Sequence, residues 1–187
     1  FLIIISIKIF LIKRKKLRKD VRKYLELKEY RKGGNRQNNK LPVWVAFSYF
    51  ELGTVTMMYN YLRGDFRKAI LAYSFAKTDY AKRDTEVTDT WLDAVRNLRN
   101  YCAHNSMLVG MTSSVVLLDS NDDTTLLQAD NDLFSRIYAL KKLVPTADVD
   151  NMKNDIKKLI KETPVDVYLL GILPSNWEEI YDKIVEF

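Results

Sequence analysis

The residues best suited to chemistry lie in one short stretch near the middle of the chain. The stretch from Trp91 to His104 reads WLDAVRNLRNYCAH, and His104 is the only histidine in the sequence. Imidazole is the one side chain whose ordinary pKa lets it gain and lose a proton near neutral pH. Arg99 lies five residues earlier, and its planar guanidinium can hold a phosphate through two parallel hydrogen bonds. Together these side chains indicate chemistry at a phosphodiester.

RNA cleavage needs few groups beyond these two. The 2′-hydroxyl is a nucleophile held beside the scissile phosphate, so the substrate itself supplies proximity. The protein must move a proton and stabilise charge on the phosphate oxygens. We assign the proton to His104 and the charge to Arg99, with Asn100 orienting the imidazole or donating to the phosphate. The predicted substrate contacts beside them are Arg96, Asn97 and Asn105.

Other kinds of site find little support in the sequence. There is no histidine pair, no cysteine pair and no carboxylate–histidine cluster with the spacing of metal ligands. No glycine-rich loop could cradle a phosphate. We therefore predict neither a metal nor a cofactor. A lone cysteine, Cys102, cannot form an intrachain disulfide, so nothing indicates an oxidising compartment and a cytoplasmic location is expected.

Apolar spacing predicts that the motif stretch is a helix. One face would carry Trp91, Val95, Leu98 and Cys102, with the thiol as a small buried group. The opposite half carries the polar residues. Either Thr88 or Asp89 is the expected N-cap. On an ideal helix Arg99 and His104 are about 140° apart, so the helix must end near Ala103 if the two side chains are to converge.

The composition predicts an all-α domain. The 187 residues include only 6 Gly and 4 Pro, and 47% are hydrophobic, which is typical of one mostly helical globular domain. A long helix is predicted from Val43 to about Leu62, ended by Gly64 as a left-handed cap. Val115 to Leu118 is a short strand or an extended arm. The other predicted helices are 66–75, 130–143, 148–161 and a terminal helix opened by a capping box from Ser175 to Glu178.

The N-terminal segment is strongly basic. Between Lys13 and Lys40 the sequence holds 13 Lys and Arg against 3 Asp and Glu, a charge of +10 within a chain of net charge +6. This pattern fits a contact with nucleic acid or anionic lipid, or a solvated charged helix. The apolar run Phe1 to Ile12 is shorter than the roughly 20 residues that span a bilayer. A membrane contact through Phe1 to Lys16 is therefore the weaker alternative.

Several motifs resemble one known family. The Arg99-x4-His104 spacing, with a polar residue directly after the Arg, resembles the signature of HEPN ribonucleases. The wider context resembles the Abi-like family of bacterial abortive-infection proteins, and it is carried by Leu41-Pro42-Val43-Trp44-Val45-Ala46, Gly53-Thr54, Trp91-Leu92, Leu98-Arg99-Asn100, Cys102-Ala103-His104, Leu170-Gly171-Ile172-Leu173-Pro174 and Trp177-Glu178.

The resemblance implies a fold and a function. It implies a HEPN-like helical bundle over 41–187, preceded by the basic segment 1–40. It also implies a metal-independent endoribonuclease that cuts single-stranded RNA in phage defence and acts as a toxin, in some cases restrained by a partner RNA. Two copies would line one cleft, each with an Arg–His motif. A homodimer would also supply the second imidazole that one chain lacks.

Departures from the family pattern keep a second interpretation open. The residues after the motif are Asn105-Ser106-Met107-Leu108-Val109-Gly110, without the Arg and Trp that are common there in the family. The family's glutamate falls at Ser48, and Glu51, one turn later on the predicted helix, could support the site instead. The alternative is a non-catalytic RNA-binding or antitoxin-like module on the same fold.

Overall fold

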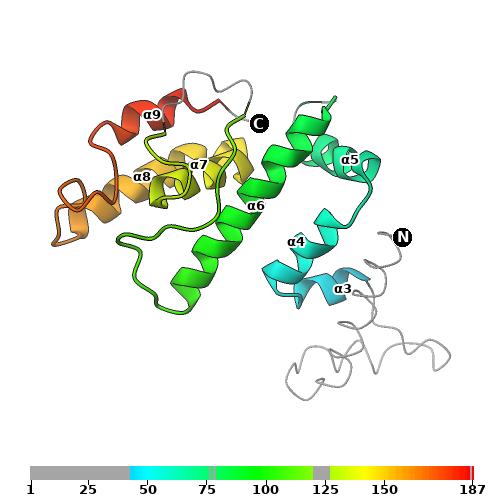
Figure 1. Ribbon diagram of the computed structural model, residues 1–187, viewed down its shortest axis with the longest axis horizontal. Helices are drawn as coiled ribbons and strands as arrows, with labels where there is room; N and C mark the ends of the chain where they lie inside the picture. The colour runs from blue at the N-terminus through cyan, green and yellow to red at the C-terminus, as the bar shows by residue number, and fades with distance from the viewer. Residues whose placement is uncertain (1–42, 76, 78, 120–126, 186) are drawn as a thin grey trace, which may run out of the picture. The chain divides into compact units, whose positions relative to one another are not determined.

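The computed structural model describes residues 43–187 except 76, 78, 120–126 and 186 (Figure 1). No strand occurs among these residues, so the predicted all-α class is confirmed. The basic segment 1–40 lies outside them. The helices are α3 (Val43–Ser48), α4 (Leu52–Asn60), α5 (Gly64–Ser74), α6 (Lys82–Ala103), α7 (Leu133–Leu143), α8 (Thr146–Glu162) and α9 (Trp177–Lys183).

The chain divides into two compact units, Phe1–Arg67 and Lys68–Phe187. In the first unit, the prediction of a single helix from Val43 to Leu62 is wrong, because two helices, α3 and α4, occupy this range. The amides of Tyr49 and Phe50 donate to carbonyls only three residues back, at 3.2 and 3.1 Å. This tighter turn closes α3, and Glu51 is extended, with ψ at 144°, before α4 begins. Ser48 and Glu51 therefore do not share a helix face.

The connection between α4 and α5 also differs from the prediction. Gly64 is the first residue of α5 and not a left-handed cap. Tyr61 ends α4 in a right-handed conformation, with its amide bonded to the carbonyls of Met57 and Tyr59. Asp65 then lies in the first turn of α5, where a carboxylate complements the helix dipole.

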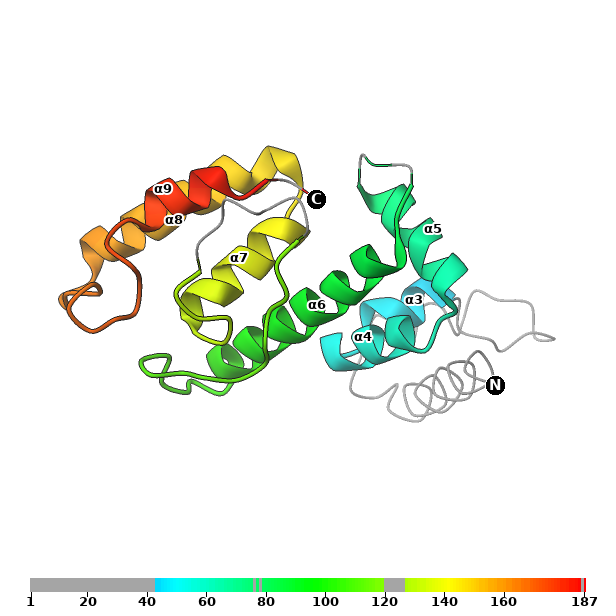
Figure 2. The ribbon, with the colours of Figure 1, turned by 45° about the horizontal axis from the view of Figure 1, so that its top comes forward.

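Helix α6 is the longest element of the second unit, with 22 residues and a length of about 33 Å. Helix α7 packs against it (Figure 2). Trp91 of α6 is fully buried there. Its ring packs edge to face against that of Tyr138 of α7, with the ring centroids 6.3 Å apart. The buried residues of this cluster come from α6, from α7, from the segment between these two helices and from the end of α9: Val87, Trp91, Ala94, Val116, Tyr138, Ala139 and Ile184.

Helices α8 and α9 run side by side in the same unit (Figures 1 and 2). Their apolar faces meet α7 in a second cluster of buried residues. On the outer side, Lys153 pairs with Asp182 at 2.6 Å and Lys157 pairs with Glu178 at 2.8 Å. The cluster consists of Phe134, Val149, Val167, Leu173, Trp177, Ile180 and Tyr181.

An extended segment crosses the buried face of α6. The indole nitrogen of Trp91 donates to the carbonyl of Leu117 at 2.9 Å, and the amide of Leu117 donates to Thr90 Oγ1 at 3.0 Å. The amide of Val116 donates to the carbonyl of Asp130 at 2.7 Å. Of the two predicted alternatives for 115–118, the extended arm is therefore confirmed and the strand is not.

Helix α6 begins at Lys82, several residues before the predicted cap at Thr88 or Asp89. The cause is Asp84, whose buried carboxylate accepts from the amide of Ala81 at 2.6 Å and pairs with Lys77 at 3.2 Å. A carboxylate at the third helical position satisfies an amide that would otherwise lack a partner. Thr88 lies inside the helix and donates to the Asp84 carbonyl at 2.7 Å.

The later helices follow the prediction closely, except at the start of α9. Asp132 caps α7 by accepting from the amide of Ser135 at 2.7 Å. Asn176, and not Ser175, precedes α9, and no side chain caps it. The predicted capping box is therefore wrong, because the helix begins one residue later and Glu178 binds Lys157 instead. Within the described part of the chain, no helix has both the length and the apolar character to span a membrane.

Candidate functional site

The motif residues lie at the C-terminal end of α6, and the helix ends where the sequence predicted. Ala103 is the last helical residue and His104 occupies the C-cap position, with φ −96° and ψ 8°. The amide of Ser106 donates to the Tyr101 carbonyl at 2.9 Å, and that of Asn105 donates to Cys102 at 3.1 Å. These two bonds form a Schellman motif, in which the residue after the cap is left-handed.

Asn105 is that left-handed residue, with φ at 52°. Asparagine tolerates this conformation better than most residues. It therefore has a clear backbone role directly after His104. Its predicted contact with substrate stays a prediction, and the exposure of its side chain is compatible with both roles.

His104, Arg99 and Asn100 are all exposed at this helix end. Arg99 NH1 donates to Asn100 Oδ1 at 3.2 Å. The amide of His104 donates to the Asn100 carbonyl at 3.0 Å, which closes the last turn of the helix. His104 is attached about 140° round the axis from Arg99, and because no helical turn follows it, its imidazole can turn toward the arginine. The structure thus brings the three predicted catalytic residues to one exposed helix end.

Arg96 differs from Arg99 in its charge environment. Its guanidinium pairs with Asp93 one turn earlier, and both side chains are 39% exposed. The pair lies on the same surface of α6 but largely neutralises its own charge. A phosphate would have to compete with Asp93 for this arginine, so Arg99 is the more available cation.

The side chain of Asn97 accepts a hydrogen bond from Ser113, a residue that follows the motif in the chain. Ser113 Oγ lies 2.5 Å from Asn97 Oδ1. The same hydroxyl lies 2.6 Å from NH2 of Arg136, on α7. Sequence reasoning did not identify Ser113 or Arg136, since neither lies near the motif in the chain and neither forms a local pattern with it.

Arg136 is completely buried. Its NH1 donates to the Asp132 carbonyl at 2.6 Å and to Ser135 Oγ at 3.2 Å, and NH2 also reaches the Ser114 carbonyl at 3.4 Å. Burial lowers the pKa of Arg136, and the nearby negative charge of Asp132 opposes the shift. An arginine side chain nevertheless stays charged in proteins. The hydrogen-bond acceptors of this buried cation named here are all neutral oxygens.

Cys102 is exposed, so the prediction of a buried thiol on the apolar face is wrong. The fully buried residues of α6 end at Ala94. The extended segment 115–118 and α7 cover the earlier part of the helix. The apolar spacing continues beyond Ala94, but Leu98 is only half-buried and Cys102 is uncovered.

Glu51 belongs to the first unit, whereas the motif belongs to the second. It occupies the N-cap position of α4 but makes no side-chain cap there, and it is exposed. Its predicted support of the site stays a prediction.

The comparison with protein families supplies the identification. A model described as Abi-like protein matches residues 7–109, which is more than half of the chain. The chain belongs to the Abi-like family. The matched segment contains α3 to α6 and ends five residues after His104. Family membership indicates abortive-infection phage defence as the setting of this protein. None of the curated proteins or solved structures compared with the chain matches it.

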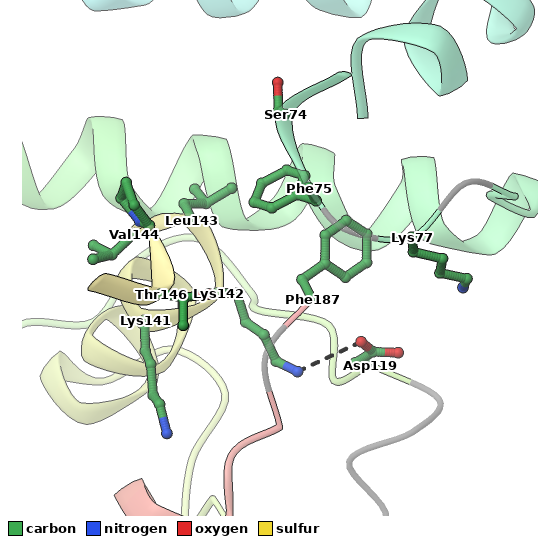
Figure 3. A pocket seen from close by; sticks show the side chains of 11 residues that line it. Ser74, Phe75, Lys77, Asp119, Lys141, Lys142, Leu143, Val144, Thr146 and Phe187 are labelled. Atoms are coloured by element: carbon green, nitrogen blue, oxygen red, sulfur yellow. Dashed lines mark hydrogen bonds and ion pairs between the residues drawn. The ribbon is translucent and has the colours of Figure 1, made fainter. Parts of the chain in front are cut away.

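The second unit of this Abi-like protein also holds a cavity of about 600 Å³, away from the motif. Phe75 and Phe187 form its aromatic wall, with ring centroids 5.2 Å apart (Figure 3). Among the residues that line the cavity, Lys142 points toward Asp119, whereas Lys141 points away from Asp119. None of the predicted site residues lines it. No group of three or more potential metal ligands occurs among the residues described.

Proposed function

We propose that this Abi-like protein is a HEPN-type endoribonuclease that cuts single-stranded RNA without a metal ion. One observation carries the proposal. Helix α6 ends at Ala103, so that the only imidazole of the chain is exposed at the end of the helix that also exposes Arg99. A proton carrier and an exposed guanidinium at one accessible helix end are the groups that RNA cleavage requires.

The reaction is an internal transesterification. His104 accepts the proton of the 2′-hydroxyl, and the 2′-oxygen forms a bond to phosphorus. The bond from phosphorus to the 5′-oxygen breaks, and that oxygen takes up a proton. The products are a 2′,3′-cyclic phosphate and a 5′-hydroxyl. Arg99 donates to the non-bridging oxygens, where negative charge increases in the transition state.

The homodimer belongs to the same proposal. One imidazole can accept the first proton, but the leaving oxygen needs a donor at the same time. A second copy related by a two-fold axis supplies another His104 as that donor. The exposure of Cys102, Ala103 and His104 at the helix end is compatible with such a contact.

The biological role we propose is that of a toxin in abortive infection. The setting follows from the family, and RNA cleavage would provide the toxic activity. The basic segment from Lys13 to Lys40 could hold the substrate or a regulatory RNA through its phosphates. The protein would act in the cytoplasm, where its RNA substrates are.

The test is cleavage of single-stranded RNA in EDTA. His104→Ala removes the proton carrier and should slow cleavage by about 10² to 10⁴-fold. Arg99→Ala removes the cation and should slow it by about 10² to 10³-fold. Arg83→Ala is the matched control, since Arg83 is exposed at the opposite end of α6. Loss of activity in the chelator, or full activity in both motif variants, would contradict the proposal.

The dimer is tested by mixing wild-type protein with an excess of His104→Ala protein. A mixed dimer has one imidazole for two proton transfers, so activity should fall well below the share of wild-type subunits, and activity in proportion to that share would contradict the shared site. Size-exclusion chromatography with light scattering measures the stoichiometry directly. Salt-sensitive RNA binding without any product would instead support the non-catalytic RNA-binding or antitoxin-like module.

A further inference from the structure

A relay of three side chains connects the buried interior of the second unit to the polar surface of α6. It starts at Arg136 of α7, passes through Ser113 at 2.6 Å and ends at Asn97 Oδ1 at 2.5 Å. Arg136 is completely buried, whereas Ser113 and Asn97 are half-buried. The relay therefore runs from a fully buried guanidinium to a partly exposed amide on α6.

The chemistry of these groups gives the relay one direction. A guanidinium has donors and no acceptor, so Ser113 Oγ accepts a hydrogen bond from Arg136. The serine hydroxyl has one proton of its own, and Asn97 Oδ1 is the acceptor that lies within reach. Asn97 therefore accepts on the side that faces the protein. Its amide nitrogen, with two N–H donors, faces the other way.

Asn97 shares a helix face with Asn100 and His104, two of the proposed catalytic residues, whereas Arg99 lies about 160° round the helix from Asn97. Residues three and four apart are neighbours on a helix surface. Asn97, Asn100 and His104 follow this spacing, so their side chains form one polar row. Seven residues of helix correspond to about 10 Å along the axis. An RNA chain whose scissile phosphate lies at His104 can therefore place a flanking phosphate beside Asn97.

We propose that Ser113 and Arg136 orient Asn97 as a hydrogen-bond donor to a backbone phosphate that flanks the scissile one. This inference rests on the proposed ribonuclease function and assigns positioning roles to two residues outside the motif. A freely rotating amide would present its oxygen to the phosphate about as readily as its nitrogen, and two acceptors repel. The buried guanidinium removes that alternative, and it does so at any working pH because it stays charged.

The decisive variant is Asn97→Asp. A carboxylate has nearly the same shape and still accepts from Ser113, so the relay and the fold are kept. Its outer group becomes a negatively charged acceptor in place of a donor. We expect KM for RNA to rise about tenfold or more, since a hydrogen bond to a charged group is lost and repulsion is added. The value of kcat should change less than twofold, because a flanking contact is made equally in the ground and transition states.

Ser113→Ala tests the relay without changing the charge. It releases the Asn97 amide, and KM should rise by about threefold. Ser113→Thr keeps the hydroxyl and should restore the wild-type KM, which a general loss of packing would not allow. The matched controls are Asn154→Asp, on the exposed face of α8, and Ser106→Ala, an exposed serine outside the relay. Thermal melts show whether each variant is folded.

Failure of the inference can be distinguished from failure of the proposed function. If the wild type cleaves RNA and Asn97→Asp has an unchanged KM, the inference is wrong although the function stands. If the wild type binds RNA but does not cleave it, the function fails, and fluorescence anisotropy still measures the contact. A labelled RNA should then bind about tenfold more weakly to Asn97→Asp than to Asn154→Asp. Equal binding, or no RNA binding by the wild type, overturns the inference.

Discussion

Lys142 and Asp119 form an ion pair of 3.5 Å in which the side chains are only 0% and 4% exposed. Lys142 Nζ also donates to the carbonyl of Val185 at 2.5 Å. Its neighbour Lys141 donates to the carbonyls of Tyr181 and Ile184 at 2.6 and 2.9 Å. Two consecutive lysines in the last turn of α7 therefore bind the backbone at the end of α9 and just after it.

Lys142→Met should destabilise the fold strongly. The variant keeps a similar apolar stem but removes the ammonium from a buried carboxylate. Breaking a buried pair in this way costs about 3 kcal/mol or more of the free energy of unfolding. Lys158→Met is the matched control, because Lys158 pairs with Glu162 at 3.9 Å with both side chains well exposed, and such pairs contribute less than about 1 kcal/mol. Urea denaturation measures both, and equal losses would contradict the prediction.

Thr90→Val should weaken the attachment of the extended arm. Thr90 Oγ1 accepts from the amide of Leu117 and donates to the carbonyl of Val87 at 2.8 Å. Valine keeps the shape but leaves the Leu117 amide without this acceptor, which costs about 1 to 3 kcal/mol. Thr112→Val, at an exposed position, is the control. Faster hydrogen exchange at Leu117 should accompany the loss of stability. Unchanged exchange would show that the arm is held by other contacts.

Tyr181 should make stability depend on pH in the alkaline range. Burial raises the pKa of Tyr181 from 10.0 to about 12, assisted by the negative charges of Asp150 and Asp182. Below pH 10 the hydroxyl is neutral in the folded and unfolded states, so its contribution is fully present. Between pH 10 and pH 12 the unfolded hydroxyl ionises first, and the free energy of unfolding falls.

Tyr181→Phe isolates this effect. The variant loses the hydrogen bond to the Val149 carbonyl, which is 2.9 Å long and worth about 1 kcal/mol. The free energy of unfolding of the wild type minus that of the variant should be constant well below pH 10. It should then fall and change sign before pH 12, because ionisation of the unfolded hydroxyl costs more than the hydrogen bond contributes. Guanidinium denaturation across that range measures it. A difference that grows with pH would show that the sign is wrong.

Asn105 can be tested for two roles at once. Asn105→Gly keeps the left-handed backbone and should change the free energy of unfolding by less than about 0.5 kcal/mol. Asn105→Val forces a branched residue into that conformation and should cost about 1 to 2 kcal/mol. If the amide also contacts RNA, as the sequence predicts, both variants should bind RNA more weakly by a similar factor. Weaker binding by Asn105→Val alone would limit Asn105 to the backbone role.

The helices were predictable where local signals decide them. The apolar period and Pro145 placed α7 and α8 within a few residues of their true bounds. The start of α6 was not predictable in the same way, because it depends on the Asp84 carboxylate binding the amide of Ala81. The exposure of Cys102 was missed for a related reason. An apolar spacing shows which face could be buried, but it does not show how far along the helix other elements cover it.

The candidate site was predictable only in part. The types and spacing of Arg99, Asn100 and His104 identified the helix end that the structure exposes. The partner of Asn97 could not be found, because Ser113 lies 16 residues away in an irregular segment and Arg136 lies a further 23 residues on. Contacts of this kind depend on the tertiary fold, and no local pattern in the sequence predicts them.

The contacts of Trp91 have a practical consequence for anyone who shortens this protein. Its covering residues Val116, Tyr138 and Ile184 all follow Val109, the last residue of the segment that matches the family model. The ring of Phe187 also packs on Trp91, with ring centroids 4.8 Å apart. A fragment trimmed to the matched segment would leave a bare indole on α6 and should aggregate when expressed, so deletion studies should keep the chain through Phe187.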